Sequence, residues 1–332
     1  MTRVAVDAMG GDRGPEEIVA GAVAAASDRI TPVLVGPNGL DTQGLALIEA
    51  PDAIEMDEKP TEAVRAKPQS SLVVACRSVG QGRADAVVSA GNTGAMLAAC
   101  LLELRRLPGV RRPGIAVTIP AQDGPSVLID SGANADARPE DLVQFAHMGV
   151  VFAQEILEVR KPKVRLLSIG EEPEKGNQLT LEAHALLEAS DLPFAGNTEG
   201  RDLLLSGGNV VVTDGFTGNI ALKLIEGTIR SLLEGIRAEI TTTTRGKLGG
   251  LLIRPAGRRL RQRLDPDTYG GAYLLGLRGL AVIAHGNSSQ RAIANAIRLA
   301  ARGVENDVVG RLAERVGKTV LESATSTTPT PT

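Results

Sequence analysis

Short runs of β-branched residues alternate along this chain with longer stretches that are rich in Ala and Leu and repeat with helical period. This alternation is typical of successive βαβ units. It predicts a mainly parallel sheet with helices on both faces, which is a three-layer α/β/α sandwich. The candidate strands are Val4–Val6, Thr31–Val35, Ala84–Ser89, Ile115–Ile119, Ser126–Asp130, Lys163–Ser168, Phe194–Gly196 and Val210–Thr213.

The composition excludes several classes of protein. Of the 332 residues 43% are hydrophobic, and the net charge is −3, which fits a globular chain rather than a disordered one. Four Phe, two Tyr and no Trp leave few rings to stack on bases, so we expect no nucleic-acid partner. The two cysteines, Cys76 and Cys100, are too few for a four-thiolate zinc site, and we expect no metal.

No segment of the sequence is suited to export or to crossing a bilayer. The N-terminal apolar run meets Asp7 almost at once, which leaves no hydrophobic region for a signal peptide. The longest uncharged stretch, Ala86–Leu102, contains Gly and polar residues and falls short of the roughly 20 apolar residues of a transmembrane helix. We therefore expect a cytoplasmic protein.

Polar, Gly-rich loops follow many of the candidate strands. In a parallel sheet the carboxyl ends of the strands share one edge, so these loops are expected to converge on one crevice. Glycine permits close backbone approach, and the N–H groups at a following helix start attract an anion. Each loop taken alone is equally well explained as a simple turn. The loops are Asp7–Asp12, Ser89–Gly94, Asp130–Asn134, Gly170–Asn177, Gly196–Asp202 and Asp214–Asn219.

The loops supply polar groups but no evident activated nucleophile. The sequence contains no G-x-S-x-G, H-E-x-x-H, C-x-x-C or G-x-G-x-x-G motif. A set of amides, hydroxyls and a few cations suits binding of a phosphate and stabilisation of an oxyanion, with phosphate itself as the nucleophile. The candidate groups are Asn92, Asn134, Asn177, Asn219, Thr93, Thr217, Lys175 and Lys223.

Of the three histidines, His285 is the one at a predicted strand-to-helix junction with small polar neighbours. A helix cap at Ser288 or Asn287 is the competing explanation for that segment. His147 and His184 fall inside helical patterns, where a packing or surface role is expected.

A basic insert at about 240–268 interrupts the α/β pattern. Between Arg245 and Arg263 no acidic residue occurs and leucines are interleaved with the cations. Pro255 and Gly257 are expected to break this stretch into two short helices that form a hairpin. A solvated helix pair is one explanation, and contact with an anionic membrane surface or an acidic partner is the other. The expected contact residues are Arg245, Lys247, Leu251, Leu252, Arg254, Arg258, Arg259 and Arg261.

Residues 1–322, with the hairpin included, are predicted to form a single α/β domain. Residues 323–332 are rich in Ser, Thr and Pro and are expected to be a disordered tail.

Six motifs follow one another along the chain: Val6–Asp12, Ser89–Ala95, Ile129–Asn134, Gly170–Asn177, Val212–Asn219 and Ala284–Gly286. They occur in the order found in the bacterial acyl-ACP:phosphate acyltransferases, the PlsX family, and the chain resembles that family from about Val4 to about Arg302. The family's fold is related to that of the phosphate acetyltransferases and the isocitrate and isopropylmalate dehydrogenases, which agrees with the predicted sandwich.

The resemblance implies that long-chain acyl-ACP and inorganic phosphate give acyl phosphate and free acyl carrier protein. The product would supply an acyl-phosphate-using glycerol-3-phosphate acyltransferase in phospholipid synthesis. The resemblance also implies a homodimer, no cofactor, and peripheral contact of the helical hairpin with the inner face of the cell membrane.

Carried over by motif, Lys175 and Asn219 are the expected catalytic pair. The resemblance implies phosphate or substrate ligands at Asn92, Thr93, Asn134, Asn177, Thr217 and Gly218, with Asp214 nearby to fix its loop and His285 at the rim. The sequence departs from the family at Arg13, where His is common, and its insert carries Arg where relatives often have Lys.

Two alternatives remain open. A phosphate acyltransferase acting on acyl-CoA would use the same fold and oxyanion chemistry. A non-catalytic membrane scaffold for lipid synthesis would need the basic hairpin but neither Lys175 nor Asn219.

Overall fold

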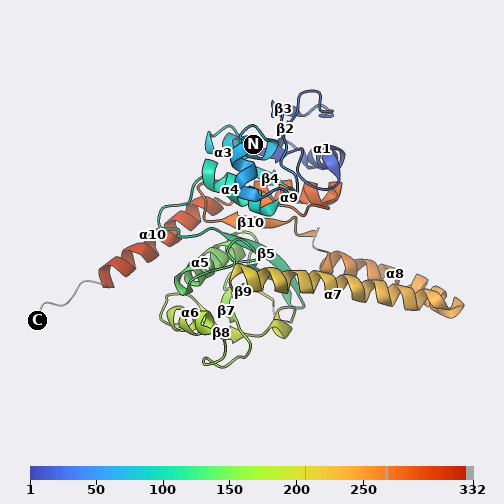
Figure 1. The fold of residues 1–332 in the computed structure, drawn as a ribbon. Helices are drawn as coiled ribbons and strands as arrows, with labels where there is room; N and C mark the ends of the chain where they lie inside the picture. Colours follow the sequence, from blue (N-terminus) through green and yellow to red (C-terminus); the bar gives the residue numbers. More distant parts are fainter. Residues whose placement is uncertain (206, 266–267, 327–332) are drawn as a thin grey trace, which may run out of the picture.

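The computed structural model describes residues 1–205, 207–265 and 268–326. Over these residues the strands form a single sheet of eleven, in the order β3-β2-β1-β4-β11-β10-β5-β6-β9-β7-β8, with helices on both faces (Figure 1). The predicted three-layer sandwich is therefore confirmed. The strands are β1 (Thr2–Asp7), β2 (Ile30–Gly36), β3 (Ala46–Glu49), β4 (Ala86–Ser89), β5 (Gly114–Ala121), β6 (Gly124–Ile129), β7 (Lys163–Leu167), β8 (Phe194–Thr198), β9 (Asn209–Val212), β10 (Ala272–Leu275) and β11 (Leu280–Ile283).

The sheet reverses direction at its centre. Strands β3, β2, β1, β4 and β11 run parallel to one another, and β6, β9, β7 and β8 also run parallel to one another. Three antiparallel pairings, β11–β10, β10–β5 and β5–β6, join these groups, which consequently point in opposite directions. The expectation that all the loops leave one shared edge is therefore wrong. The physical cause is the short hairpin between β5 and β6, because a parallel connection needs a dozen or more residues.

Helices cover both faces of the sheet. α1, α9, α5, α6 and α10 pack on one face, while α2, α3, α4 and the first turns of α7 lie on the other. Because side chains alternate along β1, Val4 and Val6 pack in the core on the α1 and α9 side of the sheet, and Ala5 packs in the core on the α3 and α4 side. The helices are α1 (Gly14–Ala25), α2 (Pro60–Ala66), α3 (Ser71–Gly80), α4 (Thr93–Glu103), α5 (Pro139–Glu155), α6 (Gln178–Glu188), α7 (Gly215–Thr242), α8 (Thr244–Leu264), α9 (Gln290–Glu305) and α10 (Val308–Ser326).

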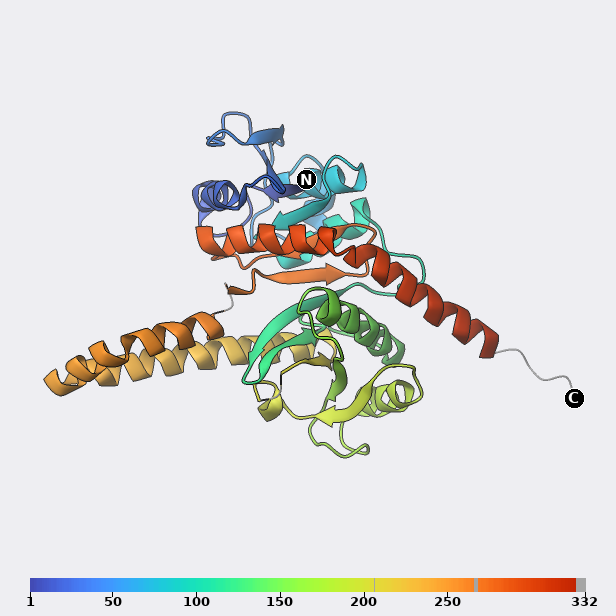
Figure 2. The ribbon, with the colours of Figure 1, turned by 180° about the vertical axis from the view of Figure 1, so that it is seen from behind.

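The helical hairpin is larger than predicted. α7 and α8 lie side by side and project away from the sheet as one arm (Figures 1 and 2). The predicted break at Pro255 and Gly257 is wrong, because α8 continues through both residues. Pro255 removes a single backbone donor from the helix, and the neighbouring helix bonds and the packing on α7 maintain the helix across it. The turn is at Thr243, whose hydroxyl accepts a hydrogen bond from the Gly246 amide at 3.0 Å.

The C-terminal helix α10 reaches Ser326, so residues 323–326 of the predicted tail are helical, and residues 327–332 lie outside the described part of the chain. Within residues 1–205, 207–265 and 268–326, no helix combines the length and the apolar character that a membrane span requires.

Candidate active site

Helix α4 follows β4 and helix α7 follows β9, so one helix comes from each of the two oppositely directed groups of strands. A polar side chain caps each helix. Asn92 caps α4 by accepting a hydrogen bond from the Ala95 amide at 3.1 Å, and its own amide donates to the Met56 carbonyl at 3.0 Å. Asp214 caps α7 by accepting from the Thr217 amide at 2.9 Å and from the Thr217 hydroxyl at 2.7 Å. Three predicted ligands, Asn92, Asp214 and Thr217, therefore hold the helix starts in place.

The loop after β1 is built around the buried carboxyl of Asp7. Asp7 accepts hydrogen bonds from the hydroxyls of Ser71 at 2.6 Å and Ser89 at 2.7 Å. Burial raises the pKa of Asp7, and these hydrogen bonds oppose that rise. A Cβ at Gly10 would lie 2.6 Å from Asp7 Oδ2 and 2.8 Å from the Gly91 amide, so only glycine lets the two loops meet.

The loop after β6 wraps around Asp130, which is fully buried. The Asp130 carboxylate accepts from the Ile115 amide at 3.0 Å, from the Asn134 amide at 2.7 Å and from the Asn134 side chain at 2.8 Å. Asn134 also donates to the Pro113 carbonyl at 2.7 Å. Burial raises the pKa of Asp130, opposed by these donors. Asn134, a predicted ligand, is thus committed to shaping this loop.

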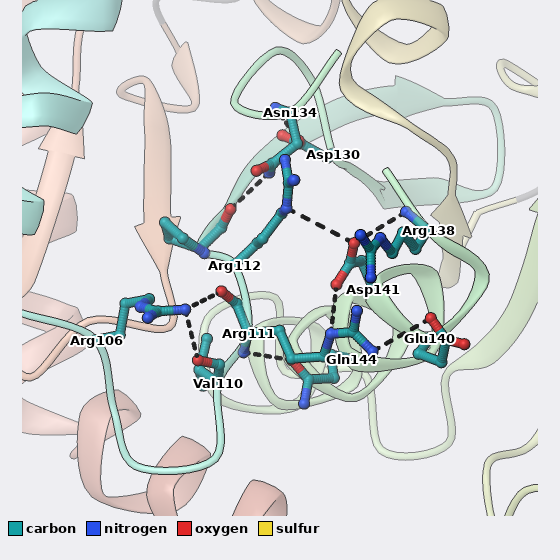
Figure 3. A network of polar contacts seen from close by, with 11 residues as sticks. Arg106, Val110, Arg111, Arg112, Asp130, Asn134, Arg138, Glu140, Asp141 and Gln144 are labelled. Carbon is teal, nitrogen blue, oxygen red and sulfur yellow. Dashed lines mark hydrogen bonds and ion pairs between the residues drawn. The ribbon is translucent and has the colours of Figure 1, made fainter. Parts of the chain in front are cut away.

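An arginine network lies beside that loop (Figure 3). The Arg111 guanidinium lies 3.1 Å from the buried Asp141 carboxylate, and Arg112 lies 3.8 Å from the same group. Asp141 in turn accepts from the Arg138 amide at 2.9 Å, at the start of α5. The network fixes Pro113, the Asn134 partner, relative to α5.

The loops after β6, β9 and β7 leave the sheet side by side. Ile129 pairs with Val212, and Val212 pairs with Leu166, so these three strands end at the same level. The loop after β7 carries Lys175, which is exposed, and its carbonyl accepts from the Ser168 hydroxyl at 2.7 Å. Asn177 at the end of this loop caps α6 by accepting from the Thr180 amide at 2.9 Å.

A cavity of about 410 Å³ lies where the two strand groups meet. One side comes from Gly91, Thr93 and Gly94 at the start of α4 and from His285 and Gly286 after β11. Ser131 and Gly132 after β6 and one face of α7 supply the other side. Residues of β5 line the base of the cavity, and apolar side chains extend it towards the C-terminal end of α8. These side chains are Ile115, Val117, Ile119, Leu222, Ile225, Ile229 and Leu264.

The structure therefore brings together only some of the predicted site residues. Thr93, Asn219 and His285 line the cavity, and Asn219 lies on the second turn of α7 rather than in a loop. Gly218 is buried against the Asp130 carbonyl, where a Cβ would clash. Within the described part of the chain, Lys175 and Asn177 are not among the lining residues.

Sequence reasoning missed part of the site. Glu226 and the apolar wall of α7 line the cavity, and Lys223, noted only as a loop cation, lies with them. Asn219, Leu222, Lys223 and Glu226 are spaced at i, i+3, i+4 and i+7, which places them on one helical face. Treating the segment after Asp214 as the start of a helix would have revealed that face.

Two solved phosphotransacylases share this fold. A branched-chain phosphotransacylase from Enterococcus faecalis superposes with a TM-score of 0.59 at 15% identity, covering 92% of this chain and 99% of that chain. A phosphotransacetylase from Streptococcus pyogenes gives 0.58 at 19% identity, covering 92% and 94%. At such low identity the likeness defines the fold alone.

Closer relatives define the family. A family model described as "Fatty acid synthesis protein" matches residues 2–311. The phosphate acyltransferase of Heliobacterium modesticaldum is 44% identical over 326 residues, covering 95% of this chain and 97% of that protein. That of Desulfitobacterium hafniense is 46% identical over 320 residues, covering 93% and 96%. The chain belongs to this family and is a phosphate acyltransferase, as the resemblance of its motifs predicted.

Proposed function

We propose that this enzyme transfers a long acyl group from acyl carrier protein to inorganic phosphate within the cavity. An oxygen of hydrogen phosphate bonds to the thioester carbonyl carbon, and the carbon–sulphur bond breaks. The proton of hydrogen phosphate ends on the sulphur, which gives acyl phosphate and free carrier protein. The observation that best supports this proposal is that Thr93 and Asn219 line one cavity, although they come from oppositely directed halves of the sheet.

Phosphate is proposed to bind between the starts of α4 and α7. The N-terminus of a helix carries a partial positive charge and attracts anions. Thr93 is the first residue of α4, and the Asn219 side chain lies one turn into α7. Lys223, one turn further on, lines the same cavity and supplies a full positive charge. Asn219 then donates to the developing oxyanion of the thioester.

Lys175 remains our proposed partner of Asn219 in catalysis. Its loop leaves the sheet beside the β9–α7 junction, since β7 and β9 are neighbours that end at the same level. Its side chain is exposed, and we propose that it extends towards the start of α7 and polarises the thioester carbonyl. Asn177 and Asn134 are proposed to act by fixing their loops.

The apolar part of the cavity is proposed to hold the acyl chain. Leu222, Ile225 and Ile229 present one side of α7 to the cavity, and Ile115 and Ile119 of β5 face them. An alkyl chain buried there gains about 0.8 kcal/mol for each CH₂ group removed from water. The apolar lining therefore favours a long chain over acetate.

We further propose that the arm formed by α7 and α8 contacts an anionic membrane surface. Leu251 and Leu252 are 61% and 75% exposed, and the predicted contact residues Arg245, Lys247, Arg254, Arg258, Arg259 and Arg261 are all exposed on α8. Such a mixture of leucine and arginine suits a helix lying in the membrane interface. The chain is also proposed to work as a homodimer and to pass acyl phosphate to a glycerol-3-phosphate acyltransferase.

The test is release of the carrier-protein thiol from palmitoyl-ACP, measured with and without inorganic phosphate and with palmitoyl-CoA as a parallel substrate. Phosphate-dependent release that is faster from ACP is the expected result. Faster release from CoA would replace ACP by CoA as the acyl donor, and no release from either thioester would contradict the proposal.

A further inference from the structure

A histidine and a glutamate from different elements meet inside the cavity. His285 follows β11, and its Nε2 lies 3.2 Å from Oε1 of Glu226 on α7. Both residues line the cavity. The His285 side chain is 48% exposed and that of Glu226 is 21% exposed, so the carboxylate is the more buried of the two.

The proposed reaction requires a proton to move between two reacting groups. Hydrogen phosphate loses its proton as its oxygen bonds to the acyl carbon, and the departing thiolate gains one. An imidazole suits this transfer, because its ordinary pKa lets it both accept and donate a proton near neutral pH. A carboxylate beside the ring fixes its orientation and stabilises the imidazolium that forms in between.

We propose that His285 carries this proton from the attacking phosphate to the leaving sulphur, and that Glu226 is the residue that positions its ring. This inference rests on the proposed function. The attacking oxygen's electron pair forms the bond to carbon, and the pair of the carbon–sulphur bond goes to sulphur. The imidazole takes the phosphate proton and then returns it to sulphur, so the ring ends unchanged.

The other titratable groups of the cavity do not fit this task. Imidazole is the side chain whose ordinary charge change falls near neutral pH, whereas Lys223 contributes an amine to the cavity and Glu226 a carboxylate. Burial raises the pKa of Tyr269, which keeps its phenol protonated. The remaining histidines are engaged elsewhere: His147 accepts from Arg315 at 3.2 Å, and His184 pairs with Asn197 at 2.9 Å.

The test uses the full chain with palmitoyl-ACP and inorganic phosphate. We expect His285→Ala to lower kcat about 100-fold, the scale of general acid–base catalysis, with KM for phosphate changed less than threefold. Added imidazole should restore at least a tenth of the wild-type kcat, since the truncated side chain leaves room in the cavity. Glu226→Gln should lower kcat about 10-fold and leave KM unchanged. The matched control is Glu234→Gln, an exposed position two turns further along α7.

The outcomes distinguish failure of the proposed phosphate acyltransfer from failure of the His285 role alone. A wild-type enzyme that needs no phosphate for thiol release removes the proposed function and this inference with it. Phosphate-dependent wild-type activity together with near-normal kcat in His285→Ala overturns the inference alone. A raised KM with unchanged kcat, or a folded His285→Ala protein that imidazole does not rescue, would likewise overturn the role in proton transfer. Circular dichroism of each variant verifies folding.

Discussion

Helix α7 has two parts with opposite surroundings. Its root, residues 215–229, packs Ala221, Leu222 and Ile225 against a small core formed with β5, β6 and β9. Beyond this the helix packs along α8, and Leu232 and Ile236 are 60% and 55% exposed. The same helix therefore supplies the cavity wall at one end and an exposed apolar stripe at the other. On the side of the root that faces the sheet, Ala221, Leu222 and Ile225 are partly buried and serve packing, whereas the exposed Leu232 and Ile236 of the arm indicate a surface that meets another phase or partner.

The largest effect is expected at the root. Asn219→Ala should lower kcat about 100- to 1000-fold, because it removes a donor to the developing oxyanion. Steady-state release of carrier-protein thiol measures it, and Asn38→Ala, an exposed position after β2, is the matched control. Turnover within threefold of wild type would place the chemistry outside the cavity.

The next prediction separates the two candidate lysines. Lys175→Ala should lower kcat about 100-fold if its loop serves the root of α7 as proposed. The exposed Lys161→Ala, in the loop before β7, is the control. Near-normal turnover in Lys175→Ala, together with a large loss in Lys223→Ala, would identify Lys223 of α7 as the catalytic cation. Lys175 would then lie outside the active site.

On the arm the expected effect is on membrane binding rather than on catalysis. Changing Arg258, Arg259 and Arg261 to Glu should weaken binding to anionic vesicles about 100-fold, since each basic residue near such a surface contributes about 1 kcal/mol. Activity on soluble palmitoyl-ACP should persist. Sedimentation with phosphatidylglycerol vesicles makes the measurement, and unchanged sedimentation would rule out the membrane role.

The smallest effects compare two glycines of the same helix. Gly218→Ala at the root should destabilise the protein by about 1–3 kcal/mol, because its Cβ would meet the Asp130 carbonyl. Gly235→Ala on the arm meets no atom within 4 Å and should stabilise its helix by about 0.5–1 kcal/mol. Thermal unfolding followed by circular dichroism compares them. Equal effects would show that the root and the arm do not differ as described.

The strands and their loops could be predicted because their signals are local. β-branched runs such as Val4–Val6 and Val210–Thr213 mark strands wherever the sheet is buried on both faces, and all eight predicted strands are present. Three strands of the described residues are not among those eight: β10, β11 and the edge strand β3, whose four residues, Ala46–Glu49, carry no alternating pattern. The family resemblance was equally accessible, because its motifs are contiguous.

The reversal of the sheet has a local sign in the sequence, whereas the set of residues that lines the cavity depends on pairings that a local pattern does not reveal. The few residues between β5 and β6 do encode their antiparallel pairing, because no crossover helix fits there. By contrast, the meeting of His285 with Glu226 requires β11 to pair with β4 and α7 to cross over β6. Those contacts join segments far apart in the chain, so the pair could not be found from spacing.

The most direct test of the central claim is hydrogen–deuterium exchange of the whole chain with and without palmitoyl phosphate, the proposed product. We expect slower exchange at residues 215–229 of α7 and at the start of α4, with little change at residues 230–242. Protection confined to the arm, or no protection at the root of α7, would contradict the assignment of this cavity as the site of acyl transfer.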